Sequence, residues 1–363
     1  PMVLGIVAYP KFGIIVLLVT AYLLFFFGKF SLGDHPIGLV MDALEYMLIA
    51  GFFVKQKFRK KWNMFANPIS YLVIAWIVYN LFEVINPNAA SVLAWVYTVR
   101  TVAIILLMYF VFVFQITEIS FVKLLIKIWL GLSTFAAIWG YLQEIHGYFN
   151  FEWAWLREDP AAMNLYFVMG HWRKFSIFTD PVTFAYNMAV ASVLCIALLF
   201  GPLQYYKKVI LFFMILLFMS AMLFSGTRGG FVLVPACIFL LMVMCFNKKV
   251  LVFGSIVGVI IALIIISPTD NLLLKRFQTA FNPTNDASYN VRAQNQAYIQ
   301  PYIRTHPIGG GLGSVGVWAS RFSPNSPLAK FPPDSGYVRV AVELGYVGLL
   351  LFCTLIFTVL YTG

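Results

Sequence analysis

Apolar residues are gathered along this chain in long runs that polar connections separate. The runs lie approximately at residues 10–27, 37–54, 69–85, 92–114, 120–142, 180–200, 209–224, 230–246, 250–267 and 336–358. Because a bilayer offers the backbone no hydrogen-bonding partner, a run of about 20 apolar residues crosses it as a helix. The pattern predicts an all-α polytopic membrane protein with about 10 transmembrane helices, in which residues 1–363 form a single integral membrane domain.

The composition supports a membrane protein and argues against a soluble domain. Hydrophobic residues make up 61% of the chain and charged residues 11%, whereas soluble domains contain about 25% charged residues. The net charge is +11, but the basic residues are divided among short connections. They do not form the single stripe that is typical of nucleic-acid binding, so we expect no nucleic-acid partner. Four cysteines fall inside predicted helices without metal-ligand spacing, and we interpret them as core residues.

Basic connections indicate the orientation of the predicted helices. Five positive charges lie within residues 55–61, and further pairs lie at 207–208 and 248–249. If the helices alternate in direction, these connections share one side, which the positive-inside rule makes cytoplasmic. The N-terminus is then cytoplasmic, and the two long connections, residues 143–179 and residues 268–335, lie on the outer side.

The two outer connections are long enough to have structure of their own. Residues 143–179 are rich in aromatic side chains, which suit the level of the lipid headgroups. Residues 268–335 contain apolar-periodic stretches at 272–281 and 291–303, and we expect short helices there that pack on the membrane domain. The chain stops directly after its last predicted helix, so we expect the natural protein to continue beyond Gly363.

Ionisable residues occur inside several predicted helices, where charge is costly and marks candidate functional positions. In the orientation given above, those in the outer half are Asp42, Glu45, Glu83, Arg100, Arg339 and Glu343. The grouping favours an outward cavity for a polar or anionic substrate, with Glu45, Arg100, Arg339 and Glu343 as lining residues. The alternative is a set of structural pairs, such as Arg339 with Glu343, which lie four residues apart on one helix face.

The short connection Ser225-Gly-Thr-Arg-Gly-Gly230 combines glycines with an arginine on the outer side. Glycine lets backbone N–H groups approach a phosphate closely, and the guanidinium of Arg228 supplies a fork of donors. The connection is therefore a candidate phosphate site. A tight turn between two helices with an arginine at the interface is the alternative.

Two further motifs lie close to the last predicted helix. Gly311-Leu-Gly-Ser-Val-Gly316 formally matches a dinucleotide fingerprint, but that fingerprint requires a preceding strand in a βαβ unit. We interpret this segment instead as a flexible turn that approaches a substrate. Asp334 follows two prolines and precedes a helix, so it is either a helix N-cap or a general base at the membrane surface.

Several stretches in this order resemble the bacterial O-antigen ligase and polysaccharide polymerase superfamily. They are Arg173 with Asp180-Pro-Val-Thr-Phe184, then Ser225-Gly-Thr-Arg-Gly-Gly230, Arg292 with His306-Pro-Ile-Gly-Gly-Gly-Leu-Gly313, Asp334-Ser-Gly-Tyr337, and Glu343-Leu-Gly-Tyr-Val-Gly348. The resemblance covers roughly residues 170 to 350. Each motif is modest, but their order and the large outer loop before the last helix make the set fairly specific.

The resemblance implies a multi-pass enzyme of the bacterial inner membrane whose active site faces the periplasm. Such an enzyme transfers glycan from an undecaprenyl-pyrophosphate donor to a sugar hydroxyl with inversion, and without metal or other cofactor. Carried over, Arg228 and Arg292 would hold the pyrophosphate, with Arg173 and Arg304 as further candidates. Asp334 would be the base that takes the acceptor proton, and His306 is a second candidate for that role.

Ligases of this superfamily typically carry a histidine where this sequence has Asp334, and this departure favours a polymerase. The acceptor would then be another lipid-linked repeat unit, with membrane lipid and a chain-length regulator as further partners. A ligase that uses lipid A core as the acceptor, a lipid-linked glycan transporter and a membrane scaffold are the alternatives. Transporters usually bind near the membrane midplane between repeats, and no repeat is visible here. We also expect Arg228, Arg292 and Asp334 to converge on one outward cavity.

Overall fold

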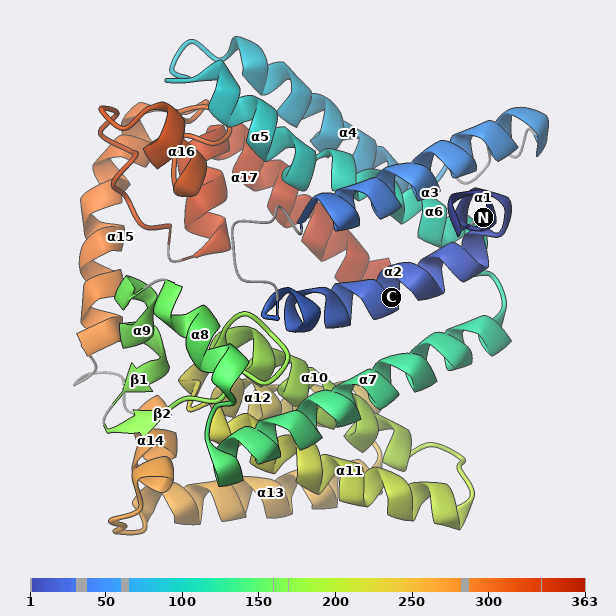
Figure 1. Cartoon of the computed structure of the whole chain (residues 1–363), viewed down its shortest axis with the longest axis vertical. Coiled ribbons are helices and arrows are strands. Elements are labelled where there is room, and N and C mark those ends of the chain that lie inside the picture. Colours follow the sequence, from blue (N-terminus) through green and yellow to red (C-terminus); the bar gives the residue numbers. More distant parts are fainter. Residues whose placement is uncertain are drawn as a thin grey trace. The chain divides into compact units, whose positions relative to one another are not determined.

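The computed structural model of the chain consists almost entirely of helices (Figure 1). It describes residues 2–30, 38–59, 65–158, 160–168, 170–281, 287–333 and 335–362. The α-helices are α1 (Met2–Ala8), α2 (Pro10–Gly28), α3 (Gly38–Arg59), α4 (Pro68–Phe82), α5 (Val92–Val102), α6 (Met108–Gln115), α7 (Ile119–His146), α8 (Asn150–Glu158), α9 (Pro160–Tyr166), α10 (Pro181–Leu199), α11 (Tyr205–Phe224), α12 (Arg228–Cys245), α13 (Lys248–Ile266), α14 (Leu272–Ala280), α15 (Ala287–Thr305), α16 (Val317–Phe322) and α17 (Gly336–Thr362). Short 3-10 segments are η2 (Glu83–Ile85) and η3 (Ile104–Leu107), and two short strands, β1 (Phe167–Val168) and β2 (His171–Trp172), pair antiparallel.

Nine helical segments in the described part of the chain are long and apolar enough to cross a membrane. This finding confirms the prediction of an all-α polytopic membrane protein. The predicted run 37–54 also forms a helix, α3, but it is not among the nine. The physical reason is its charge, because Asp42, Glu45 and Lys55 fall within one stretch of its sequence.

The contacts of the chain group into two compact units. The first unit contains Pro1–Ile14, Ala43–Ile119 and Thr284–Gly363, and the second contains Ile15–Asp42 and Ser120–Pro283. Each unit has its own hydrophobic core. The single domain and the loop boundaries expected from the sequence stay predictions.

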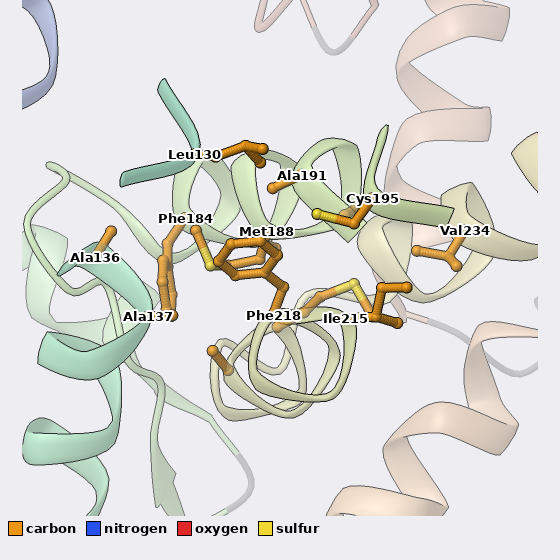
Figure 2. Packing of buried hydrophobic residues seen from close by; sticks show 14 of the residues in the cluster. Leu130, Ala136, Ala137, Phe184, Met188, Ala191, Cys195, Ile215, Phe218 and Val234 are labelled. Carbon is orange, nitrogen blue, oxygen red and sulfur yellow. The ribbon is translucent and has the colours of Figure 1, made fainter. Parts of the chain in front are cut away.

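In the second unit, α10 packs against α11 and α12. Figure 2 shows Phe184 and Met188 of α10 close to Phe218 of α11 in this core. Gly140 of α7 lies against Phe184, where a Cβ atom would come within 2.6 Å of the ring. Small residues matter here because helices in lipid associate through close packing rather than through the hydrophobic effect. This packing fixes the ends of α10 and α12, from which the candidate site is built.

In the first unit, α17 packs against α4 and α15. Its helical path is interrupted at Gly345, whose φ of 63° and ψ of −160° lie outside the helical region. Next to this kink, the amide of Tyr346 donates to the carbonyl of Pro307, and the amide of Gly310 donates to the carbonyl of Val342. The kink therefore receives the glycine-rich segment that begins at Pro307.

The glycine-rich segment is a buried packing element, and the expectation of a flexible turn that approaches a substrate was wrong. Residues 309–315 are all buried. A Cβ atom at Gly311 would come within 2.6 Å of the Cβ atom of Ala89, and one at Gly313 would come equally close to Thr98 Oγ1. The glycines therefore allow the backbone to approach the neighbouring helices and loops closely.

Candidate functional site

Arg173 is held against the connection between α11 and α12 in the second unit. Its Nε donates to the carbonyl of Ser225 at 2.9 Å, and its Nη2 donates to Thr227 Oγ1 at 2.9 Å. Its Nη1 donates to the carbonyl of Leu165, and its backbone amide donates to the carbonyl of Tyr166. Because all three guanidinium nitrogens are engaged, Arg173 is a fixed positive charge beside the Ser225–Gly230 connection.

Asp180 and Arg228 flank this fixed charge. Asp180 is the N-cap of α10, and its carboxylate accepts from the amides of Val182 and Thr183 at 2.8 Å. Arg228 is the first residue of α12 and is half-buried. Burial lowers the pKa of Arg173, the carboxylate of Asp180 opposes that shift, and the positive charge of Arg228 adds to it. The two predicted pyrophosphate ligands of this unit, Arg173 and Arg228, therefore lie near each other.

Helix α14 adds Arg276 to this group. Arg276 is only 9% exposed, and its Nη1 lies 2.9 Å from where a Cβ atom would stand at Gly226. Gly226 also has a φ of 59°, so both the backbone and the guanidinium require glycine at this position. Burial lowers the pKa of Arg276 to about 10, and the positive charges of Arg173 and Arg228 add to the shift. Arg173, Arg228 and Arg276 are called the arginine cluster below.

The arginine cluster has an excess of positive charge. Lys174 and His171 lie nearby, and both face the carboxylate of Glu144, at 3.5 and 3.7 Å. By contrast, no carboxylate within the described residues forms an ion pair with Arg276. Like charges held together at low exposure repel one another, and a bound polyanion relieves that repulsion through charge-assisted hydrogen bonds. The cluster is therefore suited to a phosphate-bearing ligand.

An apolar cavity of about 310 Å³ shares two helices with the arginine cluster. Leu274 and Phe277 of α14, on either side of Arg276 in the sequence, contribute to its wall, as does Phe231 of α12. The complete lining comes from α11, α12, α13 and α14: Met219, Met222, Leu223, Phe231, Val234, Pro235, Val257, Ile260, Ile261, Ile264, Leu274 and Phe277. Positive charge and an apolar cavity on the same helices suit an amphiphile with an anionic head.

Lys29 supports the segment that carries Arg173. Its side chain is buried, and its Nζ donates to the carbonyls of Ser176 at 3.0 Å and Phe178 at 2.6 Å. The ammonium group also lies 4.1 Å from the ring centroid of Phe175. Ser176 has a φ of 55°, which is uncommon for a residue other than glycine. The contacts of Lys29 thus stabilise a strained turn three residues after Arg173.

The remaining predicted site residues lie in the first unit. Arg292 and Arg304 are exposed on α15. His306 stacks on the ring of Tyr302 with centroids 3.9 Å apart, and its Nδ1 lies 2.9 Å from Thr305 Oγ1. Asp334 lies outside the described residues.

The predicted cavity-lining residues also belong to the first unit. Arg339 and Glu343 form the structural pair that was the alternative, with Nε and Oε1 3.2 Å apart. Glu343 is buried and also accepts from backbone amides of the glycine-rich segment. Arg100 on α5 and Glu45 on α3 are half-buried.

The predicted convergence of Arg228, Arg292 and Asp334 stays a prediction. Arg228 belongs to the second unit and Arg292 to the first, and Asp334 is not described. Sequence reasoning missed Arg276 as a site residue. The available signal was a single arginine within the apolar-periodic stretch 272–281, where a solvated side chain was the simpler interpretation.

Comparison with known proteins connects this fold and cluster to a family of membrane proteins. Residues 211–353 match the family model described as O-Antigen ligase. The matched segment contains Arg228, Arg276 and the buried glycine-rich segment, and it confirms the resemblance to the O-antigen ligase and polymerase superfamily. No curated protein and no solved structure matches the chain. The chain is a multi-pass membrane protein of the type that carries out O-antigen glycan transfer.

Proposed function

We propose that this protein polymerises lipid-linked repeat units of a surface polysaccharide on the periplasmic side of the bacterial inner membrane. The donor is a glycan on undecaprenyl pyrophosphate, and the acceptor is a sugar hydroxyl of another lipid-linked unit. One observation carries the proposal: the arginine cluster lies on the helices that also line an apolar cavity. A prenyl diphosphate combines the two chemistries that such a site would recognise.

The arginine cluster contributes to the reaction by stabilising charge. Negative charge grows on the leaving pyrophosphate as the bond to the anomeric carbon breaks, and fixed guanidinium groups in a water-poor site stabilise that charge. Arg173 is already oriented by its bonds to Ser225 and Thr227, so little reorganisation is needed during the reaction. Direct attack by the acceptor hydroxyl inverts the anomeric centre and requires no metal.

The proton of the acceptor hydroxyl is assigned to Asp334, with His306 as the second candidate. A carboxylate starts from a pKa of about 4, so it needs burial or a neighbouring carboxylate to act as a base near neutral pH. His306 needs no such shift, but its Nδ1 lies close to Thr305 and to the carbonyl of Tyr302. Arg292 and Arg304 remain proposed as further pyrophosphate ligands.

A ligase is the second candidate function, and the description of the matching family favours it. The donor site would be the same, and only the acceptor would change, to lipid A core or another molecule.

The first experiment compares Arg276→Gln with Lys275→Gln in a strain that lacks the chromosomal gene. Both changes remove one positive charge from α14, but Lys275 is exposed and pairs with Asp270 at 3.1 Å. We expect loss of polymer in the Arg276 variant and normal polymer in the Lys275 variant, at equal membrane abundance. Single lipid-linked repeats that accumulate would indicate a polymerase, and long lipid-linked polymer would indicate a ligase. Normal glycans in both variants would contradict the proposed site.

A further inference from the structure

A cavity in the first unit lies between α15 and the beginning of α17. Its volume is about 370 Å³, which is within the range of about 300–1,000 Å³ that is typical of small-molecule sites. The lining residues are Tyr289, Arg292, Ala293, Asn295, Gln296, Phe331, Ser335 and Val338. Among these residues, Arg292 is the only one with a charged side chain, so the described wall of the cavity is positive.

The α15 face that forms this cavity changes character along the helix. Ile299 and Ile303 are buried in a cluster with Val342 of α17. Arg292 and Gln296 continue the same stripe toward the start of α15, because residues three and four apart share a helix face. A stripe that packs on a neighbouring helix is normally apolar along its length. Helix packing therefore explains the isoleucines but not the polar half of the stripe, where the cavity is found.

We propose that this cavity binds a sugar unit that carries a carboxylate, such as a hexuronic acid, in the acceptor glycan. The guanidinium of Arg292 offers a bidentate site for the carboxylate. The amide side chains of Asn295 and Gln296 can both donate to and accept from sugar hydroxyl groups. The rings of Tyr289 and Phe331 supply apolar surface for the C–H face of a pyranose ring. This inference rests on the proposed function, because it identifies the acceptor of that reaction.

Charge matching favours an acidic sugar over pyrophosphate in this cavity. A diphosphate carries at least two negative charges, and the arginine cluster of the second unit provides several guanidinium groups for it. The cavity on α15 provides a single guanidinium in a lining that is otherwise neutral. One carboxylate on a hydroxyl-rich ring matches that lining. The pyrophosphate role of Arg292 is the competing assignment, and the experiment separates the two.

The test uses the purified full chain in lipid nanodiscs and measures ligand binding by saturation-transfer NMR. The probes are glucuronic acid, glucose as its neutral analogue, and inorganic pyrophosphate. We expect glucuronic acid to bind about tenfold to a hundredfold more tightly than glucose, as a charge-assisted pair implies. Arg292→Gln should remove this preference while leaving weak glucose binding unchanged. Arg292→Lys, which keeps the charge but loses the bidentate fork, should fall between the two.

Matched variants make each outcome decisive. Gln294 lies on α15 but does not line the cavity, whereas Gln296 does. Gln296→Ala should weaken glucuronic acid binding, and Gln294→Ala should not. Equal binding of both sugars, or a preference that survives Arg292→Gln, would overturn the inference. Loss of pyrophosphate binding in Arg292→Gln, with displacement of glucuronic acid by pyrophosphate, would also overturn it and assign Arg292 to the donor.

The proposed function is read separately in the same samples. Arg276→Gln should abolish pyrophosphate binding and leave glucuronic acid binding intact. If pyrophosphate binding survives that change while glucuronic acid still depends on Arg292, the donor site is wrong and the sugar site stands. If pyrophosphate binding is lost but glucuronic acid shows no dependence on Arg292, the donor site stands and the sugar site is wrong.

Discussion

At the scale of single residues, buried cations separate structural from functional positions. A charge removed from water must be paired or solvated by polar groups. Lys29 meets this requirement within the protein through two carbonyls and an aromatic ring. Arg276 has no described carboxylate partner and lies near two further arginines. We therefore interpret Lys29 as a supporting residue and Arg276 as a ligand-binding one.

The buried Lys29 predicts how stability depends on pH. Burial lowers the pKa of Lys29 from 10.5 to about 7, and the negative charge of Glu152 opposes the shift. Between these two pKa values the unfolded chain holds a proton that the folded protein lacks. Stability should therefore rise with pH across this window, by at most about 1.4 kcal/mol per pH unit. Thermal unfolding of Lys29→Met between pH 7 and 10 should show a flatter profile than that of the wild type.

The control for this measurement is Lys207→Met, which changes an exposed lysine at the start of α11. Its unfolding profile should keep the wild-type slope. A Lys29→Met profile as steep as that of the wild type would contradict the assigned role of Lys29.

At the scale of elements, glycine motifs build the interfaces of α17. The segment that begins at Pro307 and the kink at Gly345 exchange backbone hydrogen bonds. A Cβ atom at Gly309 would fall against the backbone of Glu343. Two stretches that resemble family motifs are therefore complementary surfaces that pack on each other. Their glycines carry structural rather than catalytic information.

Replacement of Gly345 by alanine tests this interface. Gly345 has a φ of 63°, and an added Cβ atom would overlap the carbonyl of Pro307. We expect Gly345→Ala to lose about 1–3 kcal/mol from backbone strain, and more from the overlap. Gly336→Ala is the control, because an added Cβ atom there meets no atom within 4 Å. Thermal unfolding and membrane abundance of the two variants measure the difference, and equal values for both would refute the packing role.

At the scale of the whole molecule, the distribution of basic residues predicts the orientation in the membrane. The connections at 55–61, 207–208 and 248–249 carry much of the positive charge. The positive-inside rule places them in the cytoplasm and residues 268–335 in the periplasm. Both proposed sites use residues of that long segment, Arg276 and Arg292, so the orientation decides which compartment supplies the substrate.

Cysteine labelling tests this orientation directly. In a cysteine-free background, Val317→Cys should react with an impermeant maleimide added to intact spheroplasts, since Val317 is 77% exposed. Tyr205→Cys, at a position that is 83% exposed, should react only after the membrane is permeabilised. The opposite pattern would place the long segment in the cytoplasm and would rule out a periplasmic reaction.

The positions of the helices followed from the sequence, because the length and polarity of an apolar run are local properties. The start of α10 was equally readable, since Asp180 and Pro181 form a local cap. Arg173 and Arg228 were found through motifs that their own neighbours in the sequence define.

The tertiary structure alone decided the roles of Arg276, Lys29 and the glycine-rich segment. Lys29 contacts a carbonyl 147 residues away, and the connection at Gly226 leaves room for Arg276 of α14. The glycines near Pro307 meet a kink in α17. Such contacts depend on which segments the fold brings together, and no local pattern of residues encodes them.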